Sequence, residues 1–298
     1  MTITAFVLVF VSVFLHVTWN MMSKSGRPSM AFYALMSLTA SALWFPFMLK
    51  SGISPLTLPP HVVWLLLGSV CFEVMYMLGL ARAYKRGDIS FVYPVVRALP
   101  VLMIAAITTI FGIDAKLGAS ALCGMVLISV GCVAMPLTSF RELKLSNYIN
   151  YTTIFILLGA AGTTGYTLLD RSAMKILGEA PGGTGPLAAI GYLFWIEFGL
   201  TLGELLFVVF ERDERLEFRR LFLKSFRPML AGLCSSSAYG LILLAMHYVD
   251  NVSYIQAFRQ ISLPLGFFAG IVILKERATL PKTIGVIFIV AGLLLVAL

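Results

Sequence analysis

The sequence predicts an all-α integral membrane protein, with ten transmembrane helices arranged as two inverted five-helix repeats. Three observations predict this fold. The 298-residue chain is 59% hydrophobic and only 12% charged, whereas soluble domains average about 25% charged residues. Its apolar residues form continuous runs near the roughly 20 residues that a membrane-spanning helix needs. Its second half also repeats motifs of the first half in the same order.

Ten apolar runs follow one another, with short connections and no soluble domain between them. Their limits are 3–23, 30–49, 62–84, 89–111, 117–136, 151–174, 186–210, 228–248, 252–274 and 281–298. The runs are continuous and do not alternate with a period of two, which favours helices over the strands of an outer-membrane barrel. We expect the first run to remain as a helix in the mature protein, because it lacks the basic start and the cleavage site of a signal peptide.

The basic residues of the connections predict how the chain is oriented. With the N-terminus outside the cytoplasm, the cytoplasmic loops hold sixteen Lys and Arg residues and the opposite loops hold four. The sixteen are Lys24, Arg27, Arg82, Lys85, Arg86, Arg141, Lys144, Arg212, Arg215, Arg219, Arg220, Lys224, Arg227, Lys275, Arg277 and Lys282, and the four are Lys50, Lys116, Arg171 and Lys175. Because cytoplasmic loops are enriched in Lys and Arg, both termini are expected on the non-cytoplasmic side.

The formal charge of +8 needs no nucleic-acid partner, since anionic lipid at the inner leaflet explains it. The longest connection, 211–227, mixes basic and apolar residues. It is expected either to lie along the membrane interface as a short amphipathic helix or to be a solvated connector.

An internal repeat divides the chain into residues 1–140 and 141–298. The stretches "GLARAYKRGDISFVYPVVRALPVL" and "LLAMHYVDNVSYIQAFRQISLPLG" align, and two glycines seven residues apart occur in the fifth run (Gly124, Gly131) and again in the tenth (Gly285, Gly292). Because each repeat has an odd number of helices, the second must cross the membrane in the opposite orientation. Inverted repeats around a midplane site are typical of alternating-access carriers.

These residues resemble the EamA branch of the drug/metabolite transporter superfamily over essentially the whole chain. The resemblance rests on "AYKRGDISFVYPVVRALPVL", on "HVTWN" followed by Lys24, and on the repeated glycine pair. It implies a ten-helix carrier of the cell inner membrane, usually an exporter of amino acids, related metabolites or toxic organic compounds. The second half departs from the pattern, because "IQAFRQISLP" lacks the Tyr-Pro pair.

Arg97 stands inside an apolar run together with two prolines. An arginine at the bilayer centre costs about 2.5–3.5 kcal/mol on insertion scales, so it should face a cavity or a partner. Arg97 shares one helical stripe with Ser90 and Tyr93, and each proline removes a backbone hydrogen bond. This combination favours a bendable helix that lines a substrate pathway. The alternative is a structural ion pair between Arg97 and Glu73.

The second repeat carries the same stripe as Ser253, Gln256 and Gln260, with Arg259 one position away from the alignment. A shift of one residue in the helix would bring Arg97 and Arg259 to the midplane from opposite halves. Two guanidinium groups there would suit a substrate carboxylate or phosphonate, because arginine offers a planar bidentate fork.

Three glutamates lie within predicted spans: Glu73, Glu197 and, nearer an end, Glu204. Glu73 and Glu197 are the two considered for a coupling role. A carboxyl group in a low-dielectric environment can carry a proton at neutral pH, which makes both candidates for proton coupling. The alternative is that they are permanent counter-ions of the two arginines. Tyr76 lies on the same helical stripe as Glu73 and gives it a polar neighbour.

The first predicted helix carries His16, Trp19 and Asn20 on one face, and Tyr166 lies in the matching stretch of the sixth. An aromatic ring beside an amide suits an amphipathic solute, through stacking and hydrogen bonding. For His16 the alternative is a hydrogen-bonded packing residue.

No enzyme, metal or cofactor is expected. The three histidines (His16, His61 and His247) form no His-Glu-x-x-His motif, and the chain lacks both Gly-x-Ser-x-Gly and the phosphate loop of an ATP-driven pump. Four cysteines lack the spacing of metal ligands.

The expected function is a secondary transporter, an exporter of a small metabolite such as an amino acid or organic anion, working by alternating access with or without proton coupling. The alternatives are an exporter of hydrophobic organic cations or drugs, and a membrane sensor on the same scaffold. The expected partners are the small-molecule substrate and the lipid bilayer. A monomer is expected because the glycine faces of the fifth and tenth helices can pair within one chain, and a homodimer is the alternative.

Overall fold

The computed structural model describes residues 1–298 except 25–28, 87–88, 136, 143–150, 180–184 and 275–277, and the described residues form helices without strands. In chain order the elements are α1 (Ile3–Lys24), α2 (Met30–Ser51), α3 (Pro60–Arg86), α4 (Ile89–Phe111), α5 (Ala119–Ala134), η1 (Phe140–Glu142), α7 (Tyr151–Glu179), α8 (Pro186–Phe210), α9 (Arg212–Lys224), α10 (Arg227–Ala245), η2 (Met246–Tyr248), α11 (Val252–Phe258), η3 (Arg259–Ile261), α12 (Ser262–Leu274) and α13 (Leu280–Ala297). The predicted all-α class is confirmed for this part of the chain.

Eight of these helices are long and apolar enough to cross a membrane, namely α1, α2, α3, α4, α7, α8, α10 and α13. They support a multi-pass membrane protein. The other two predicted spans take a different form. Residues 117–136 contain α5, which has 16 residues, and residues 252–274 are divided among α11, η3 and α12. Ten spans therefore stay a prediction.

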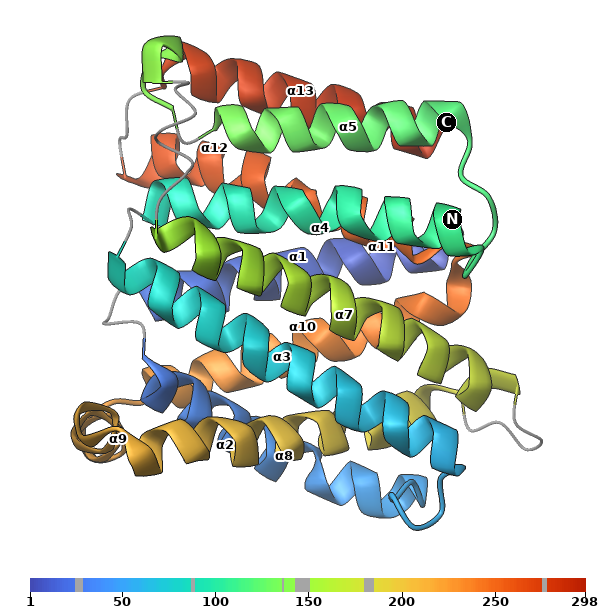
Figure 1. The fold of residues 1–298 in the computed structure, drawn as a ribbon, viewed down its shortest axis with the longest axis vertical. Helices are drawn as coiled ribbons and strands as arrows, with labels where there is room; N and C mark the ends of the chain where they lie inside the picture. The colour runs from blue at the N-terminus through green and yellow to red at the C-terminus, as the bar shows by residue number, and fades with distance from the viewer. Residues whose placement is uncertain (25–28, 87–88, 136, 143–150, 180–184, 275–277) are drawn as a thin grey trace.

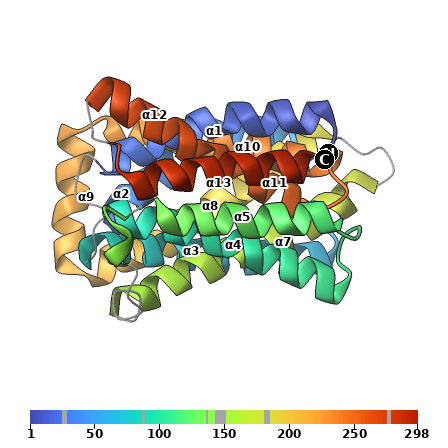
Figure 2. The ribbon, with the colours of Figure 1, turned by 90° about the horizontal axis from the view of Figure 1, so that it is seen from above.

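Helices from the two halves pack against each other. α1 packs along α10, α3 along α7, α2 along α8, and α5 along α13. α5 and α13 lie side by side in both views (Figures 1 and 2). A Cβ atom added at Gly131 would lie 2.6 Å from the carbonyl oxygen of Gly285, and one added at Gly292 would lie 2.5 Å from that of Gly124. The prediction that the two glycine faces pair within one chain is confirmed, because only glycine allows this approach.

α9 crosses one end of the bundle, and both chain termini lie at the opposite end (Figures 1 and 2). Its buried Glu214 accepts the Ala31 backbone N–H at 2.9 Å and pairs with Lys85 Nζ at 2.7 Å. A second ion pair joins Glu211, at the start of α9, to Arg82. A helix is thus present within residues 211–227, over Arg212–Lys224, and its position along the membrane interface stays a prediction. Of the basic residues used to orient the chain, Arg27, Lys144, Lys275 and Arg277 and the side chains of Lys24 and Arg86 lie outside the described residues.

The counterpart of α4 in the second half contains a 3₁₀ turn. α4 runs without interruption through Pro94 and Pro100, whereas η3 separates α11 from α12. Pro264, near the start of α12, lacks the N–H that would bond to the carbonyl group of Gln260. The backbone tightens there into a single 3₁₀ turn. The helix expected over 252–274 is therefore present as α11, η3 and α12, and a 3₁₀ turn begins within it at Arg259.

Candidate functional site

A buried cavity lies between helices of both halves. The first half contributes α1, α2 and α3, and the second contributes α7, α8, α10 and η3. The cavity is lined by His16, Trp19, Met36, Ser37, Glu73, Tyr76, Met77, Tyr166, Glu197, Leu200, Ser235, Ala238, Tyr239 and Arg259. Its volume is about 40 Å³, which leaves room for only a few water molecules.

Aromatic side chains form much of the cavity wall. The ring of Tyr166 meets those of Tyr76 and Tyr239 edge to face, with centroids 6.1 and 5.5 Å away. Trp19 Nε1 donates a hydrogen bond to His16 Nδ1 at 3.1 Å. This wall can hold an apolar group or, through the negative faces of the rings, a cation.

Tyr239 is held in place from behind the cavity wall. Its hydroxyl group donates to Asp170 Oδ2, and Tyr192 donates to Asp170 Oδ1 at 2.9 Å. Asp170 is fully buried. Each of its carboxylate oxygens accepts a hydrogen bond from a tyrosine hydroxyl group, so neither oxygen depends on a partner in the cavity. A fixed carboxylate and two hydroxyl groups therefore set the orientation of the ring.

Three charged side chains face the cavity. Glu73, Glu197 and Arg259 are all less than a tenth exposed. Among the described residues, neither carboxylate has a hydrogen bond or an ion pair with a protein group, while Arg259 lies within hydrogen-bonding reach of the Tyr166 hydroxyl. Buried carboxylates normally have partners. The two glutamates are therefore placed to take a proton or a cationic group that enters the cavity.

Arg97 connects the two halves beside the cavity. Its Nη2 donates to the backbone oxygen of Arg259 at 2.7 Å and to Ser262 Oγ at 3.0 Å, and its Nε donates to Gln260 Oε1 at 3.3 Å. Its Nη1 contacts His16 Nε2. The sequence suggested that Arg97 either lines a pathway or pairs with Glu73. In the structure it reaches the cavity through His16, and its described partners are mainly oxygen atoms of η3 and the start of α12.

Other residues selected from the sequence lie near the cavity without lining it. Asn20 donates to the backbone oxygen of His16 at 2.9 Å, and Gln260 donates to that of Gln256 at 3.1 Å. Gln256 is buried, and its Oε1 atom has no hydrogen-bond partner among the described residues. The side chains of Ser90 and Tyr93 lie outside the described residues, although their backbone belongs to α4.

Three further lining residues, Ser37, Ser235 and Tyr239, were not among the selected site residues. From the sequence, the hydroxyl groups of 234–240 suit either substrate contact or close helix packing, and Tyr239 suits a core or lipid-facing position. A signal for Tyr239 was present, because it stands in the second repeat where Tyr76 stands in the first, at the same spacing that relates Ser253 to Ser90. Ser37 carried no such signal. A lone serine in an apolar helix more often bonds to its own backbone.

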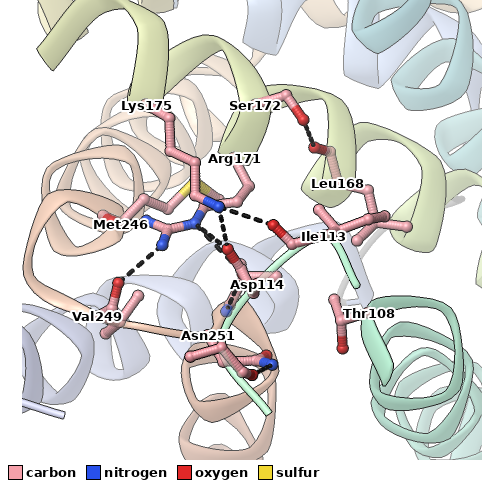
Figure 3. A network of polar contacts seen from close by, with 12 residues as sticks. Thr108, Ile113, Asp114, Leu168, Arg171, Ser172, Lys175, Met246, Val249 and Asn251 are labelled. Atoms are coloured by element: carbon pink, nitrogen blue, oxygen red, sulfur yellow. Dashed lines mark hydrogen bonds and ion pairs between the residues drawn. The ribbon is translucent and has the colours of Figure 1, made fainter. Parts of the chain in front are cut away.

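A second polar cluster lies at the end of the bundle that holds the termini (Figure 3). Asp114, whose side chain is fully buried, pairs with Arg171 Nε at 3.1 Å and with Lys175. It also accepts the backbone N–H of Val252, the first residue of α11, at 2.8 Å. The cluster therefore joins the α4–α5 loop, α7 and the start of α11.

Arg171 also contacts the segment that leads into α11. Its Nη2 donates to the backbone oxygen of Val249 at 2.8 Å, and its Nη1 donates to that of Met246. Asn251 donates to the backbone oxygen of Ala115 at 2.8 Å. The charged groups in this cluster satisfy one another and the backbone, which is the arrangement of a structural tie and contrasts with the unpartnered glutamates of the cavity.

No family model and no curated protein matches the chain. Among solved structures, 28 chains match it. One of these, described only as "Crystal structure of protein", is 16% identical, superposes with a TM-score of 0.69, and covers 99% of this chain and 96% of its own length. A likeness at this identity shows that the two chains share a fold.

Proposed function

We propose that this chain is a secondary transporter of the EamA branch of the drug/metabolite transporter superfamily, which moves a small metabolite by alternating access. The observation that carries the proposal is the buried polar cavity, which both halves line, in a chain with eight membrane-compatible helices. Substrate sites of such carriers lie between their repeats, near the bilayer midplane.

The helix pairing supports two five-helix repeats, residues 1–140 and 141–298, related by a two-fold axis. In such an arrangement α1 corresponds to α7, α2 to α8, α3 to α10 and α5 to α13. The α1–α10 pair then corresponds to the α3–α7 pair, and the α2–α8 and α5–α13 pairs each correspond to themselves. In this arrangement α5 and the α11–η3–α12 segment complete ten spans. An even number of spans agrees with the position of both termini at one end (Figure 1). We place that end on the non-cytoplasmic side of the cell inner membrane, and the basic α9 end in the cytoplasm.

The charges of the cavity favour a zwitterionic substrate such as an amino acid. The carboxylates of Glu73 and Glu197, together with the tyrosine rings, suit an ammonium group, and the guanidinium group of Arg259 suits a carboxylate. A second candidate is a hydrophobic organic cation, which the excess of two carboxylates over one guanidinium favours. With no substrate bound, a proton on Glu73 or Glu197 would remove a buried charge, so proton exchange at these residues is the proposed coupling step.

The test is counterflow in proteoliposomes that contain the purified full-length chain, with amino acids, organic acids and organic cations as substrates. We expect saturable amino-acid counterflow in the wild type. Arg259→Gln should lower the apparent affinity for the amino acid at least tenfold and leave the binding of organic cations unchanged. Glu73→Gln and Glu197→Gln should each lower the counterflow. Lys50→Gln and Glu179→Gln, which change exposed charges outside the cavity, are the matched controls.

Each contrary result identifies a different function. Movement of organic cations alone would replace the first candidate by the second. Ligand binding without counterflow would indicate a sensor, and ion flux without saturation would indicate a channel. Counterflow that survives all three cavity variants would place the substrate site elsewhere. A single chain per particle by mass measurement in detergent is the oligomeric state expected from the internal α5–α13 pairing.

A further inference from the structure

A second cavity lies at the opposite end of the membrane-spanning helices from the Asp114 cluster, beneath α9. It has a volume of about 270 Å³ and is lined by Met22, Phe32, Glu217, Arg220, Leu221, Lys224, Ser225 and Arg227. It shares no lining residue with the central cavity. These residues come from the end of α1, the start of α2, α9 and the start of α10, so the cavity opens where the bundle ends. We call it the α9 pocket.

The polar side of the α9 pocket is basic. Arg220, Lys224 and Arg227 face a single acid, Glu217, which pairs with Arg220 at 2.5 Å. Lys224 forms no ion pair with any described residue. Lys224 therefore adds a positive charge that no described acid balances. Such basic pockets at the ends of membrane-spanning helices suit the phosphate of an anionic head group.

The other side of the α9 pocket is apolar, through Met22, Phe32 and Leu221. Next to it, α9 and the residues after it carry exposed apolar side chains. Leu223 is 66% exposed and Phe226 is 84% exposed. A helix with basic and apolar residues that lies across the ends of membrane-spanning helices is typical of the lipid interface. A free phosphate ion would use only the basic side, whereas a phospholipid would use both.

We propose that the α9 pocket binds the phosphate head group of an anionic phospholipid. Lys224, Arg227 and Arg220 contact the phosphate, and the acyl chains run past the apolar residues toward the bilayer. Bound lipid thereby fixes α9 against the membrane. The proposal requires only that the chain lies in a membrane, and it is independent of what the central cavity carries.

The test is lipid binding to the purified full-length chain in detergent, measured as bound lipid by native mass spectrometry. The probes are dioleoylphosphatidylglycerol and dioleoylphosphatidylcholine, with glycerol 3-phosphate and inorganic phosphate as soluble competitors. We expect phosphatidylglycerol to bind at least tenfold more tightly than phosphatidylcholine. The triple variant Arg220→Gln, Lys224→Gln, Arg227→Gln should lose this preference. The matched triple variant Arg212→Gln, Arg215→Gln, Arg219→Gln removes three charges outside the pocket, and its affinity should stay within twofold of the wild type.

A single Lys224→Gln variant keeps the Arg220–Glu217 pair and serves if the triple variant does not fold. Its affinity for phosphatidylglycerol should fall about fivefold, the effect of one lysine near an anionic surface. Equal losses in the two triple variants would overturn the proposal in favour of diffuse surface charge. Competition by inorganic phosphate at the concentration of the lipid would overturn it in favour of a soluble anion. Equal binding of the two lipids would overturn it as well.

Discussion

α4 and its counterpart α11–η3–α12 occupy corresponding places in the two halves, yet only the counterpart contains a 3₁₀ turn. α4 contains two prolines and stays continuous, while the second segment contains one proline and is interrupted by η3. The number of prolines therefore does not decide where such a turn forms. The turn lies beside a polar neighbour on α4, since Arg97 donates to the carbonyl group of Arg259 and to the side chain of Gln260. Irregular backbone at membrane depth is tolerated where such partners are present.

α4 and the loop after it support α11 along its whole length. Arg97 bonds to the backbone oxygen of Arg259 just after α11 ends. Thr108 Oγ1 and Ser253 Oγ lie 3.2 Å apart near its start, and Asp114 accepts the first N–H group of α11. A seven-residue helix is marginal by itself. The comparison indicates that α4 and the loop after it hold α11 in place. Three substitutions test this dependence, and they are given in order of decreasing expected effect.

The largest effect is expected for Asp114→Ala. It leaves Arg171 buried without its carboxylate partner and removes the acceptor at the start of α11, and breaking a buried ion pair costs about 3–5 kcal/mol. Asp114→Asn should cost less, because the amide oxygen can still accept the Val252 N–H. The measurement is unfolding of the purified protein in detergent and SDS. Asp250→Asn removes an exposed acid of the neighbouring loop and is the control. Equal stability of the Asp114→Ala and Asp250→Asn variants would contradict the scaffold role of this end.

Arg97→Ala should have the next largest effect. It removes the donor of Gln260 Oε1 and one donor of the Arg259 backbone oxygen, which keeps the Ser262 hydroxyl group, and an unsatisfied buried acceptor costs about 1–3 kcal/mol. Hydrogen exchange should accelerate in residues 252–262 and remain unchanged in α10. Arg97→Lys should restore only part of the protection, since an ammonium group cannot reproduce the fork. Unchanged exchange together with lost transport would show instead that Arg97 acts on the substrate, as the pathway hypothesis predicts.

Thr108→Val should have the smallest effect. It removes one hydrogen bond to Ser253 with little change of shape, which is worth about 1 kcal/mol. A double-mutant cycle with Ser253→Ala measures the coupling between the two hydroxyl groups by unfolding in detergent. A coupling energy near zero would mean that the start of α11 needs no support from Thr108 and is held by Asp114 alone.

The sequence predicted the elements better than their interruptions. The expected limits 89–111 coincide with α4, and the expected 186–210 with α8, because continuous apolar runs and membrane thickness determine helix length. The turn at η3 was missed. Its residues Arg259 and Gln260 are polar, but their presence in a predicted span does not distinguish a 3₁₀ turn from an α-helix, and the side chain that contacts the turn lies 162 residues away along the chain.

The same limit applies to the central cavity. Seven residues selected from the sequence line it, namely His16, Trp19, Glu73, Tyr76, Tyr166, Glu197 and Arg259. They were found because charged and aromatic groups in an apolar helix need a partner. The partners of Arg97 were not foreseen, because they include a backbone carbonyl group, which every residue carries and no sequence pattern marks. Tyr239 was recoverable only through its alignment with Tyr76.

The glycine contacts between α5 and α13 limit which substitutions the two helices can accept. At Gly124, Gly131, Gly285 and Gly292, an added methyl group would meet the backbone of the other helix, and a backbone has no rotamer to change. The opposing residue is already glycine, so no smaller residue exists with which the partner half could compensate. A larger residue at one of these glycines would therefore clash with the backbone of the other repeat, and no substitution in that repeat could relieve the clash. The two halves resemble each other in sequence, yet along the α5–α13 contact neither half can change these glycines independently of the other.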